Sequence, residues 1–441
     1  MPEMSGAQAL VRQLRSEGVD TIFALPGVQI MAAFDALHEA QNDINLVHVR
    51  HEQATTYMAD GYAKATGKVG VAMAVPGPGA LNASAGLGTA FASSSPVLLV
   101  SGQIDSGALG KRQGQLHEVE DQLDVFKPIT KWNHRVTRVE EIPETVHEAF
   151  RHLRTGRPRP VELEIPPDTL ANLGSADIIE PEEYPGAPAS ADDIARAVQM
   201  LSEAKHPAII AGGGSAIAGA GDEILRVAEL AQAPVMTTQS SKGVISEANP
   251  YHTGTNYVTV GPAAQVMSDC DVLLAVGTRL LFRGPQGNSP RIIHIDADPD
   301  EIGKNLPTEL GIVADAKVAM GQLAERLAAS GVSKPSRSEE IAGYKRATAA
   351  SVQELAPHQV GMIQAMREQL DDDAIVISGV TNVGYWSNVA YEVRQPRSYV
   401  TSGYFGTLGY AFPTALGVKV AAPDRQVVAL CGDGGFMYSP Q

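Results

Sequence analysis

The chain has 441 residues, of which 44% are hydrophobic and 19% charged, and its formal net charge is -16. This length predicts two or three domains with ample core, and the acidic balance argues against nonspecific nucleic-acid binding and against docking on anionic membranes. The sequence contains no run near the roughly 18 apolar residues of a membrane span, and Met1 to Gly6 lack the pattern of a secretory signal. A cytoplasmic location is therefore expected.

The first part of the chain, residues 1–172, alternates helical and extended segments. Ser5 is a candidate N-cap for a helix through Gly18. A short buried strand is predicted at 21–25, further strands at 44–49, 69–75 and 97–101, and a further helix at 51–66. Strands that alternate with helices indicate a parallel, doubly wound sheet, so this part is expected to be one α/β domain.

Two stretches rich in Pro, Gly and Ser or acidic residues, 171–190 and 330–338, are predicted linkers. Between them, strands predicted at 208–211, 234–238, 272–276 and 291–295 indicate a second α/β domain over residues 190–330. A third domain, residues 355–441, has a helix near 360–370 and strands at 374–378 and 427–430. So few strands cannot build a doubly wound sheet, so this third domain is expected to be truncated at its C-terminus.

The two cysteines, Cys270 and Cys431, lie in or beside apolar runs. Two buried thiols in a reducing compartment are expected rather than a disulfide.

Several turns that follow predicted strands carry residues suited to binding. Pro26-Gly27, Glu52 and Pro76-Gly77 each follow a strand, and the carboxyl ends of parallel strands line one crevice. Gly432 to Gly435 follow the strand at 427–430 and include Asp433. Glycines let backbone N–H groups approach phosphate oxygens, and a carboxylate is a ligand for Mg²⁺. Taken singly, Glu52 can equally complement a helix dipole, and a Gly-Asp-Gly segment is more often only a turn.

The order and spacing of these motifs resemble the thiamine-diphosphate enzymes of the acetolactate synthase group. In the pyrimidine-binding domain the resemblance rests on His51-Glu52-Gln53-Ala54, Ala59-Asp60-Gly61-Tyr62-Ala63 and Pro76-Gly77-Pro78-Gly79-Ala80-Leu81-Asn82. In the central domain it rests on Ala211 to Ser215, Ala275 to Arg279 and His294 to Pro299, and in the diphosphate-binding domain on Ser402 to Tyr410 and Gly432 to Gly435. It implies three α/β domains in this order, the last represented by its N-terminal part.

The resemblance also implies roles. Glu52 would hydrogen-bond a ring nitrogen of the cofactor's aminopyrimidine and so promote the imino tautomer that removes the thiazolium proton. Leu408 matches the position of the apolar side chain that bends the cofactor, where acetolactate synthases typically carry Met. The alternative hypothesis is that Leu408 is a packed core residue. Asp433 would bind Mg²⁺. The other implied cofactor contacts are Pro26, Gly27, Pro76, Asn82, Val383, Gly384, Tyr385, Gly406, Gly434 and Gly435.

In this family an Asn-Asn pair beyond the Gly-Asp-Gly turn completes the metal site, and this sequence stops before that point. The chain is therefore expected, as a fragment or a natural truncation, to bind magnesium and diphosphate poorly on its own. Glu52 and Asp433 lie in different domains. In this family the two domains that form one active site come from different subunits, so the resemblance implies at least a homodimer.

The loop 113–120 departs from the Phe-Gln-Glu type sequence of acetolactate synthases, so the substrate stays open. Gln115 and His117 are catalytic candidates, because a histidine can shuttle protons near neutral pH; a loop histidine with only local hydrogen bonds is equally expected. Lys111 and Arg112 either attract an acidic substrate or are solvated. Val28 replaces the second Gly of the family's Pro-Gly-Gly and adds apolar bulk.

In related enzymes the central domain holds FAD, ADP or nothing. Gly212, Gly213, Gly214, Arg279 and Asp296 are the candidate FAD contacts, while Arg283 and the loop 284–288 depart from the flavin-binding pattern. The expected function is a thiamine-diphosphate and Mg²⁺ carboligase that decarboxylates a 2-oxo acid such as pyruvate and transfers the acyl carbanion to a second carbonyl. A related 2-oxo-acid decarboxylase or C–C lyase is the enzymatic alternative, and a noncatalytic binding or regulatory subunit is the alternative of another class.

Overall fold

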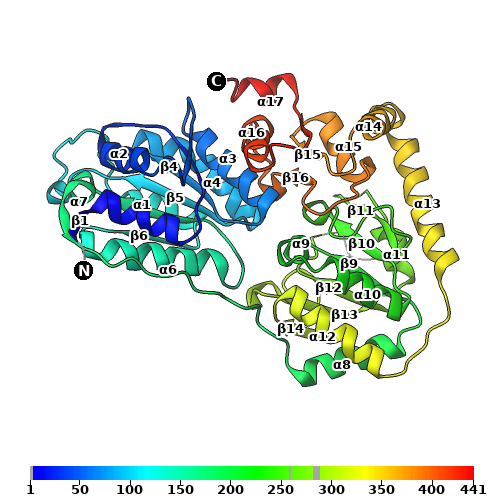
Figure 1. Ribbon diagram of the computed structural model, residues 1–441. Coiled ribbons are helices and arrows are strands. Elements are labelled where there is room, and N and C mark those ends of the chain that lie inside the picture. The colour runs from blue at the N-terminus through cyan, green and yellow to red at the C-terminus, as the bar shows by residue number, and fades with distance from the viewer. Residues whose placement is uncertain (1–2, 258–259, 282–288) are drawn as a thin grey trace. The chain divides into compact units, whose positions relative to one another are not determined.

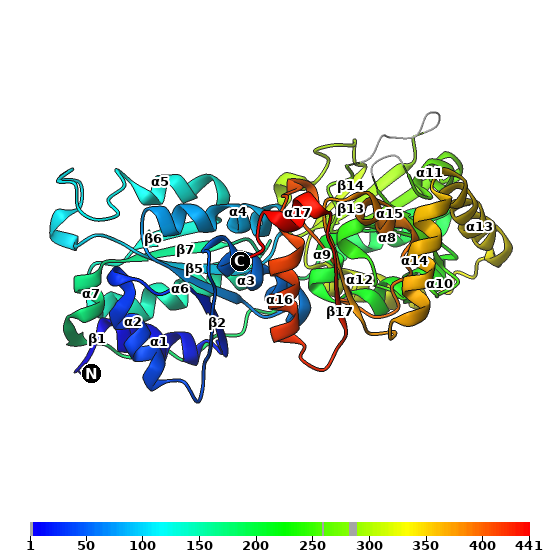
Figure 2. The same cartoon turned by 90° about the horizontal axis from the view of Figure 1, so that it is seen from above.

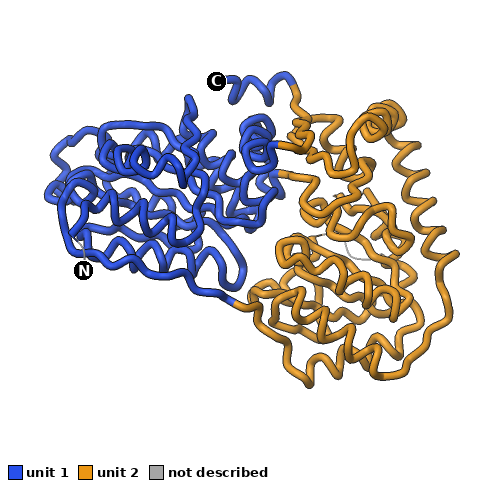
Figure 3. The backbone as a smooth tube through the Cα atoms, in the orientation of Figure 1, with its two compact units in different colours: residues 1–184, 402–423, 433–441 blue, residues 185–401, 424–432 orange. Residues whose placement is uncertain are grey.

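A computed structural model describes residues 3–257, 260–281 and 289–441 (Figure 1). The chain divides into two compact units (Figure 3). Unit 1 comprises residues 1–184, 402–423 and 433–441, and unit 2 comprises residues 185–401 and 424–432. The segment 355–441, expected as one domain, is thus shared between the two units.

Unit 1 contains a six-stranded sheet in the order β3-β2-β4-β5-β7-β6, and every neighbouring pair is parallel. The predicted strands are confirmed, and β6 and β7 are added to them. β4, β5 and β7 are buried along their whole length, as expected for strands covered on both faces. The strands are β2 (Thr21–Ala24), β3 (Asn45–His48), β4 (Gly70–Ala74), β5 (Val97–Gly102), β6 (Trp132–Arg135) and β7 (Val161–Ile165).

Helices cover both faces of this sheet. On one face the side chains of Leu10, Leu14 and Phe150, from α1 and α6, pack on β4 and β5; on the other, those of Met58 and Leu87, from α3 and α4, do so. The helices are α1 (Gly6–Ser16), α2 (Met31–Glu39), α3 (Gln53–Thr66), α4 (Pro78–Ser93), α5 (Gln122–Phe126), α6 (Ile142–Arg154) and α7 (Pro167–Ala171). The doubly wound α/β fold predicted for this domain is therefore confirmed.

The start of α1 follows the sequence prediction. Ser5 Oγ accepts a hydrogen bond from the Gln8 N–H at 3.2 Å, and Gln8 Oε1 accepts one from the Ser5 N–H at 3.2 Å. This reciprocal pair is a capping box, which satisfies backbone N–H groups that have no partner inside the helix.

The C-terminal part of unit 1 lies on α3. The helix α16 (Ala411–Ala421) runs alongside α3 in Figures 1 and 2. A Cβ on Gly61 would lie 2.4 Å from the Thr414 carbonyl oxygen, and one on Gly417 would lie 2.2 Å from the Met58 carbonyl oxygen. Glycine on each helix therefore permits this close packing. The short helix α17 (Asp433–Met437) follows near the end of the chain.

Unit 2 contains a second six-stranded parallel sheet, in the order β11-β10-β9-β12-β13-β14, and a three-stranded parallel sheet, in the order β16-β15-β17. The large sheet is formed by β9 (Pro207–Ala211), β10 (Val235–Thr238), β11 (His252–Asn256), β12 (Val272–Val276), β13 (Arg291–Asp296) and β14 (Leu310–Val313). The small sheet is formed by β15 (Ile375–Ser378), β16 (Tyr399–Thr401) and β17 (Val427–Leu430). The helices are α8 (Ala191–Glu203), α9 (Gly213–Ala218), α10 (Gly221–Ala231), α11 (Ala263–Asp269), α12 (Ala316–Ala329), α13 (Ser338–Leu355), α14 (Pro357–Gln369) and α15 (Asn382–Ala390).

Two expectations from the sequence need correction. The predicted linker 171–190 contains a strand, β8 (Leu173–Ser175), which pairs antiparallel with β1 (Glu3–Ser5). Cys270 is buried as expected, but Cys431 is exposed. It directly follows β17, an edge strand whose residues are all only half-buried, so its thiol is not enclosed.

Across residues 3–257, 260–281 and 289–441, the structure contains no helix with both the length and the apolar character needed to cross a membrane.

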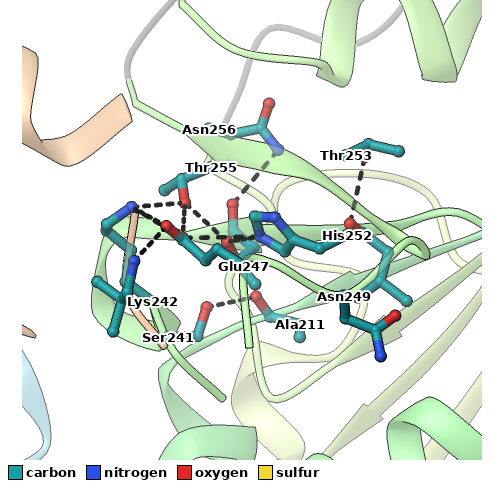
Figure 4. A network of polar contacts seen from close by, with 12 residues as sticks. Ala211, Ser241, Lys242, Glu247, Asn249, His252, Thr253, Thr255 and Asn256 are labelled. Carbon is teal, nitrogen blue, oxygen red and sulfur yellow. Dashed lines mark hydrogen bonds and ion pairs between the residues drawn. The ribbon is translucent and has the colours of Figure 1, made fainter. Parts of the chain in front are cut away.

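A buried ion pair in unit 2 ties the large sheet to the segment before β16 (Figure 4). Lys242 Nζ lies 2.8 and 2.9 Å from the two carboxylate oxygens of Glu247, and both side chains are nearly inaccessible. Glu247 Oε2 also accepts the Val393 N–H at 2.9 Å, and Oε1 accepts the Thr255 hydroxyl at 2.9 Å. Burial lowers the pKa of Lys242, whereas the charge of Lys242 holds the pKa of Glu247 below its ordinary value although burial alone would raise it.

Removing one partner of this pair is expected to destabilise the protein strongly, because the other charge is then buried without compensation. We expect Glu247→Gln to cost about 3–5 kcal/mol in the free energy of unfolding, measured by urea denaturation. Glu309→Gln, which breaks the exposed pair with Arg291, serves as the control and is expected to cost about 1 kcal/mol or less. Equal losses in the two variants would contradict the prediction.

Candidate active site

Three predicted site turns of unit 1 lie at one edge of its sheet. Pro26-Gly27 follow β2, Glu52 follows β3, and Pro76-Gly77 follow β4, and these strands are neighbours. A Cβ on Gly27 would lie 2.2 Å from Val75 Cγ1, so the turn after β2 rests directly on the end of β4. The parallel sheet therefore brings these turns together as its topology predicts.

Glu52 is half-buried and lies just before α3. Its Oε2 accepts a hydrogen bond from Asn82 Nδ2 at 3.0 Å. Its Oε1 lies 3.3 Å from the position of a Cβ on Gly79. Asn82 and Gly79 belong to the first turns of α4, so this helix orients the carboxylate and, through a glycine, leaves space beside it.

The loop that carries Gln115 and His117 lies against the turn after β4. A Cβ on Gly77 would lie 2.4 Å from the His117 carbonyl oxygen, and Gly77 has φ +56°, a conformation that L-residues rarely adopt. The neighbouring Leu116 carbonyl accepts a hydrogen bond from Gln29 Nε2 at 3.2 Å. The structure thus brings His117 to the edge of the sheet that carries Glu52.

His117 has two further unusual features. Its φ is +69°, a left-handed conformation that is uncommon for a residue with a side chain. Its Nδ1 is buried and has no hydrogen-bond partner among the described residues. Backbone strain and an orphan polar atom together mark positions where a ligand often supplies the missing contact.

The other polar residues of this loop are placed differently. Gln115 is exposed, and its backbone N–H donates to Glu118 Oε2 at 2.8 Å. Arg112 forms an ion pair with Glu120 across the loop, and Lys111 is exposed. Arg112 is therefore engaged by a neighbouring carboxylate rather than simply solvated.

The segment with Gly406 and Leu408 rests on α4. Thr407 Oγ1 lies 2.9 Å from Thr89 Oγ1, and a Cβ on Gly88 would lie 2.7 Å from Phe405 Cζ. The side chain of Leu408 is 43% exposed. Leu408 is therefore not a packed core residue, and the helix that carries Asn82 also supports its segment.

In unit 2, the turns after β15 and β17 lie side by side. Ser378 and Leu430 are paired, and the Gly379 N–H donates to the Leu430 carbonyl at 3.0 Å. Val383, Gly384 and Tyr385 lie in the first turns of α15, which follows β15. A Cβ on Gly384 would lie 2.2 Å from the Gly379 carbonyl oxygen, so a glycine is required at this position.

Asp433, Gly434 and Gly435 form the start of α17 in unit 1, and Asp433 is exposed. Within the described ranges, no three His, Cys, Asp or Glu side chains are grouped so that they could hold a metal ion. Asp433 thus offers a single carboxylate.

The glycine-rich turns of the large sheet in unit 2 have a structural explanation. A Cβ on Gly212 would lie 2.3 Å from the Gly277 carbonyl oxygen, and Gly277 has φ +59°. The turns after β9 and β12 therefore pack backbone on backbone, with Gly213 and Gly214 in the same turn. Arg279 Nε lies 3.6 Å from buried Glu301, and Asp296 accepts the Asp298 N–H at 2.9 Å. Arg283 and the loop 284–288 lie outside the described residues.

Sequence reasoning missed the buried polar residues beneath the site. Gln122 Oε1 accepts the Gly77 N–H at 2.8 Å, and both groups are buried. Glu162 and Glu164 are buried within β7; burial raises the pKa of both, and the charge of Glu164 raises that of Glu162 further. Two carboxylates at alternate positions of the apolar run Val161–Ile165 were the signal in the sequence.

Comparisons with known proteins identify the class of this chain. Family models for thiamine pyrophosphate enzymes match residues 4–125 (N-terminal TPP binding domain), 194–323 (central domain) and 379–441 (C-terminal TPP binding domain). The chain is 37% identical to a probable acetolactate synthase large subunit of Methanocaldococcus jannaschii, over 99% of this chain and 77% of that protein. It is 35% identical to the acetolactate synthase large subunit of Corynebacterium glutamicum, over 99% and 72% of the two chains. It is 34% identical to a probable 2-ketoarginine decarboxylase of Pseudomonas aeruginosa, over 99% and 78%.

The chain therefore belongs to the family of thiamine-diphosphate-dependent enzymes, in the group similar to acetolactate synthase. The resemblance read from the sequence, the three α/β domains and the assignment as an enzyme are confirmed.

The close approach at Gly77 yields a prediction about stability. Gly77→Ala is expected to lower the free energy of unfolding by at least about 2 kcal/mol, because it adds both backbone strain and a clash with the His117 carbonyl. Gly114→Ala is the matched control: Gly114, in the loop that carries His117, has φ +71°, but a Cβ there meets nothing within 4 Å. It is expected to cost only the strain of about 1–2 kcal/mol. Denaturation curves of the two variants give the comparison, and a smaller loss for Gly77→Ala would contradict it.

Proposed function

We propose that this protein is a thiamine-diphosphate and Mg²⁺-dependent carboligase that decarboxylates a 2-oxo acid, with pyruvate as the first candidate, and transfers the remaining acyl group to a second carbonyl. The observation that carries this proposal is the Glu52 carboxylate at the sheet edge, oriented by Asn82 and bordered by Gly79. Relatives named as acetolactate synthase large subunits support the substrate class.

The residues of unit 1 fit the pyrimidine half of the cofactor. Thiamine diphosphate, when bound, supplies the carbon nucleophile that protein side chains lack. Glu52 would hold a proton at a ring nitrogen of the aminopyrimidine, and Asn82 would keep the carboxyl group in place through its hydrogen bond to Oε2. Leu408 is exposed, so its apolar side chain is available to pack against the cofactor and bend it.

The remaining predicted contacts would bind the diphosphate end of the cofactor. Asp433 would provide one of the oxygen ligands of Mg²⁺, and Gly434 and Gly435 would offer backbone N–H groups to phosphate oxygens. The resemblance implies that the first turn of α15 also contacts the diphosphate. Mg²⁺ needs about six oxygen ligands, so phosphate, water and further residues would complete its shell. We also propose at least a homodimer, with each site shared between subunits, as the resemblance implies.

His117 is the candidate for proton transfer to and from the substrate. Its backbone, at φ +69°, lies against Gly77 at the sheet edge that carries Glu52, and its Nδ1 lacks a partner among the described residues. Proton transfer by a positioned side chain contributes about 10²–10⁴-fold to rate. Gln115, exposed in the same loop, would contact the substrate without carrying the proton.

FAD in the central domain stays a prediction. Arg279 follows β12 and Asp296 ends the neighbouring strand β13, where such a cofactor would bind, but the glycine turns are explained by their own packing. The absorption spectrum of the purified protein decides between a flavin and its absence.

The second candidate function is a 2-oxo-acid decarboxylase. A probable 2-ketoarginine decarboxylase matches this chain about as well as the acetolactate synthases do. Product analysis with pyruvate as the only substrate separates the two functions, since a carboligase yields acetolactate and a decarboxylase yields free aldehyde.

Glu52→Gln is expected to lower turnover of the 2-oxo acid by about 100-fold or more in the full-length protein with saturating thiamine diphosphate and Mg²⁺, because the amide cannot exchange the proton. Glu144→Gln, an exposed substitution on α6, is the control and should leave turnover unchanged. Normal turnover in Glu52→Gln would overturn the proposed function.

His117→Gln is expected to lower kcat about 100-fold, by loss of proton transfer. His117→Gly should lose the same activity yet gain about 1 kcal/mol in stability, because glycine adopts φ +69° without strain. Steady-state kinetics and denaturation curves measure the two effects. A His117→Gln enzyme with wild-type kcat would show that this histidine has only a local structural role.

A further inference from the structure

The buried side chain of Gln122, at the start of α5, has every polar group engaged. Its Oε1 accepts the Gly77 N–H at 2.8 Å, and its Nε2 donates to Ser101 Oγ at 3.0 Å and to the Gly102 carbonyl at 3.2 Å. An amide has an acceptor on one side and two donors on the other, so these contacts fix its orientation. Only 1% of Gln122 is exposed, so water cannot replace them.

Behind Gln122, the contacts continue into the centre of the sheet. Ser101 Oγ accepts from Gln122 and donates to Glu162 Oε1 at 2.6 Å. Ser101 lies in β5 and Glu162 in the neighbouring strand β7, and both are buried. The direction of each hydrogen bond is therefore set, from the Gly77 N–H through Gln122 and Ser101 to the carboxyl group of Glu162.

At the other end, the Gly77 turn is in contact with both groups of candidate residues. The His117 carbonyl lies against Gly77, in the position that leaves no room for a Cβ. The helix α4 begins at the next residue, and its first turns carry Gly79 and Asn82, which contact Glu52. A shift of Gly77 would therefore displace both the Glu52 carboxylate and the His117 loop.

We propose that Gln122 is a positioning residue for the reaction: anchored in the sheet by Ser101 and Glu162, it holds the Pro76-Gly77 turn and, through it, both the Glu52–Asn82 pair and the loop with His117. The expected effect of Gln122 on turnover rests on the proposed function, whereas its effect on the position of the His117 loop does not. Packing alone does not account for Gln122, because an apolar residue would fill the same volume without needing three hydrogen-bond partners.

Gln122→Met tests the proposal in the full-length protein, since it keeps the length of the side chain and removes all its hydrogen bonds. We expect kcat to fall about 10- to 100-fold with little change in KM, because small misplacements of reacting groups cost rate rather than binding. We also expect faster tryptic cleavage after the exposed residues Lys111 and Arg112, because their loop is released. Gln113→Met, the same change at an exposed glutamine of this loop, should alter neither result.

A pair of variants at Glu162 tests the anchor. Glu162→Gln keeps an oxygen that accepts the Ser101 hydroxyl and should behave like the wild type, whereas Glu162→Leu removes that oxygen and should resemble Gln122→Met. If Gln122→Met lowers thermal stability but leaves kcat and the cleavage rate unchanged, Gln122 is a packing residue and the proposal is wrong. If the wild type turns over no 2-oxo acid, the proposed function fails, and the cleavage rates alone decide whether Gln122 holds the loop.

Discussion

The candidate site depends on a contact between two backbones, where the carbonyl of His117 lies against the Cα of Gly77. This contact needs a residue without a side chain and with positive φ, and Gly77 meets both conditions. It joins a turn after a central strand to a loop more than thirty residues further along the chain. From it follow the start of α4, the orientation of Asn82 and the approach of His117 to the sheet edge.

Close backbone approach explains other glycines as well, and it separates structural from functional ones. Gly61 and Gly417 let two helices pack, and Gly212 and Gly277 let two turns meet. A glycine-rich turn in this protein is thus not by itself a nucleotide site. Gly79 also has a packing explanation, because a Cβ there would lie 2.5 Å from Val75 Cγ2, and Glu52 Oε1 lies 3.3 Å from the same position.

Buried polar groups are a second feature of this fold. The Lys242–Glu247 pair is neutralised within itself and is hydrogen-bonded on every side, so its role is to join the large sheet of unit 2 to the segment before β16. The buried carboxylate of Glu164 is likewise paired, because Arg135 Nε lies 2.6 Å from its Oε2. Glu162 differs: its Oε1 accepts the Ser101 hydroxyl, and its Oε2 lacks a partner among the described residues. Burial and the neighbouring charge of Glu164 therefore raise the pKa of Glu162 well above its ordinary value.

Much of the fold could be read from the sequence, because alternating apolar runs, the Ser5 cap and the turns after strands are local patterns. The same patterns placed Pro26, Glu52 and Pro76 at one edge, since parallel strands present their carboxyl ends together. Strands such as β6 and β11 were missed because polar residues interrupt their apolar pattern.

The sequence by itself determined the family and the α/β class, and it predicted that the carboxylate of Glu52 contacts the cofactor. Only the tertiary structure decided that His117 is strained against Gly77, that Arg112 is paired with Glu120, that Cys431 is exposed and that Gln122 lies beneath the site. The physical reason is that these properties arise from contacts between segments distant in the chain, from the edge position of a strand or, for Arg112 and Glu120, from the folding of one loop that brings residues eight apart together, and none of these is encoded in a local pattern of residues.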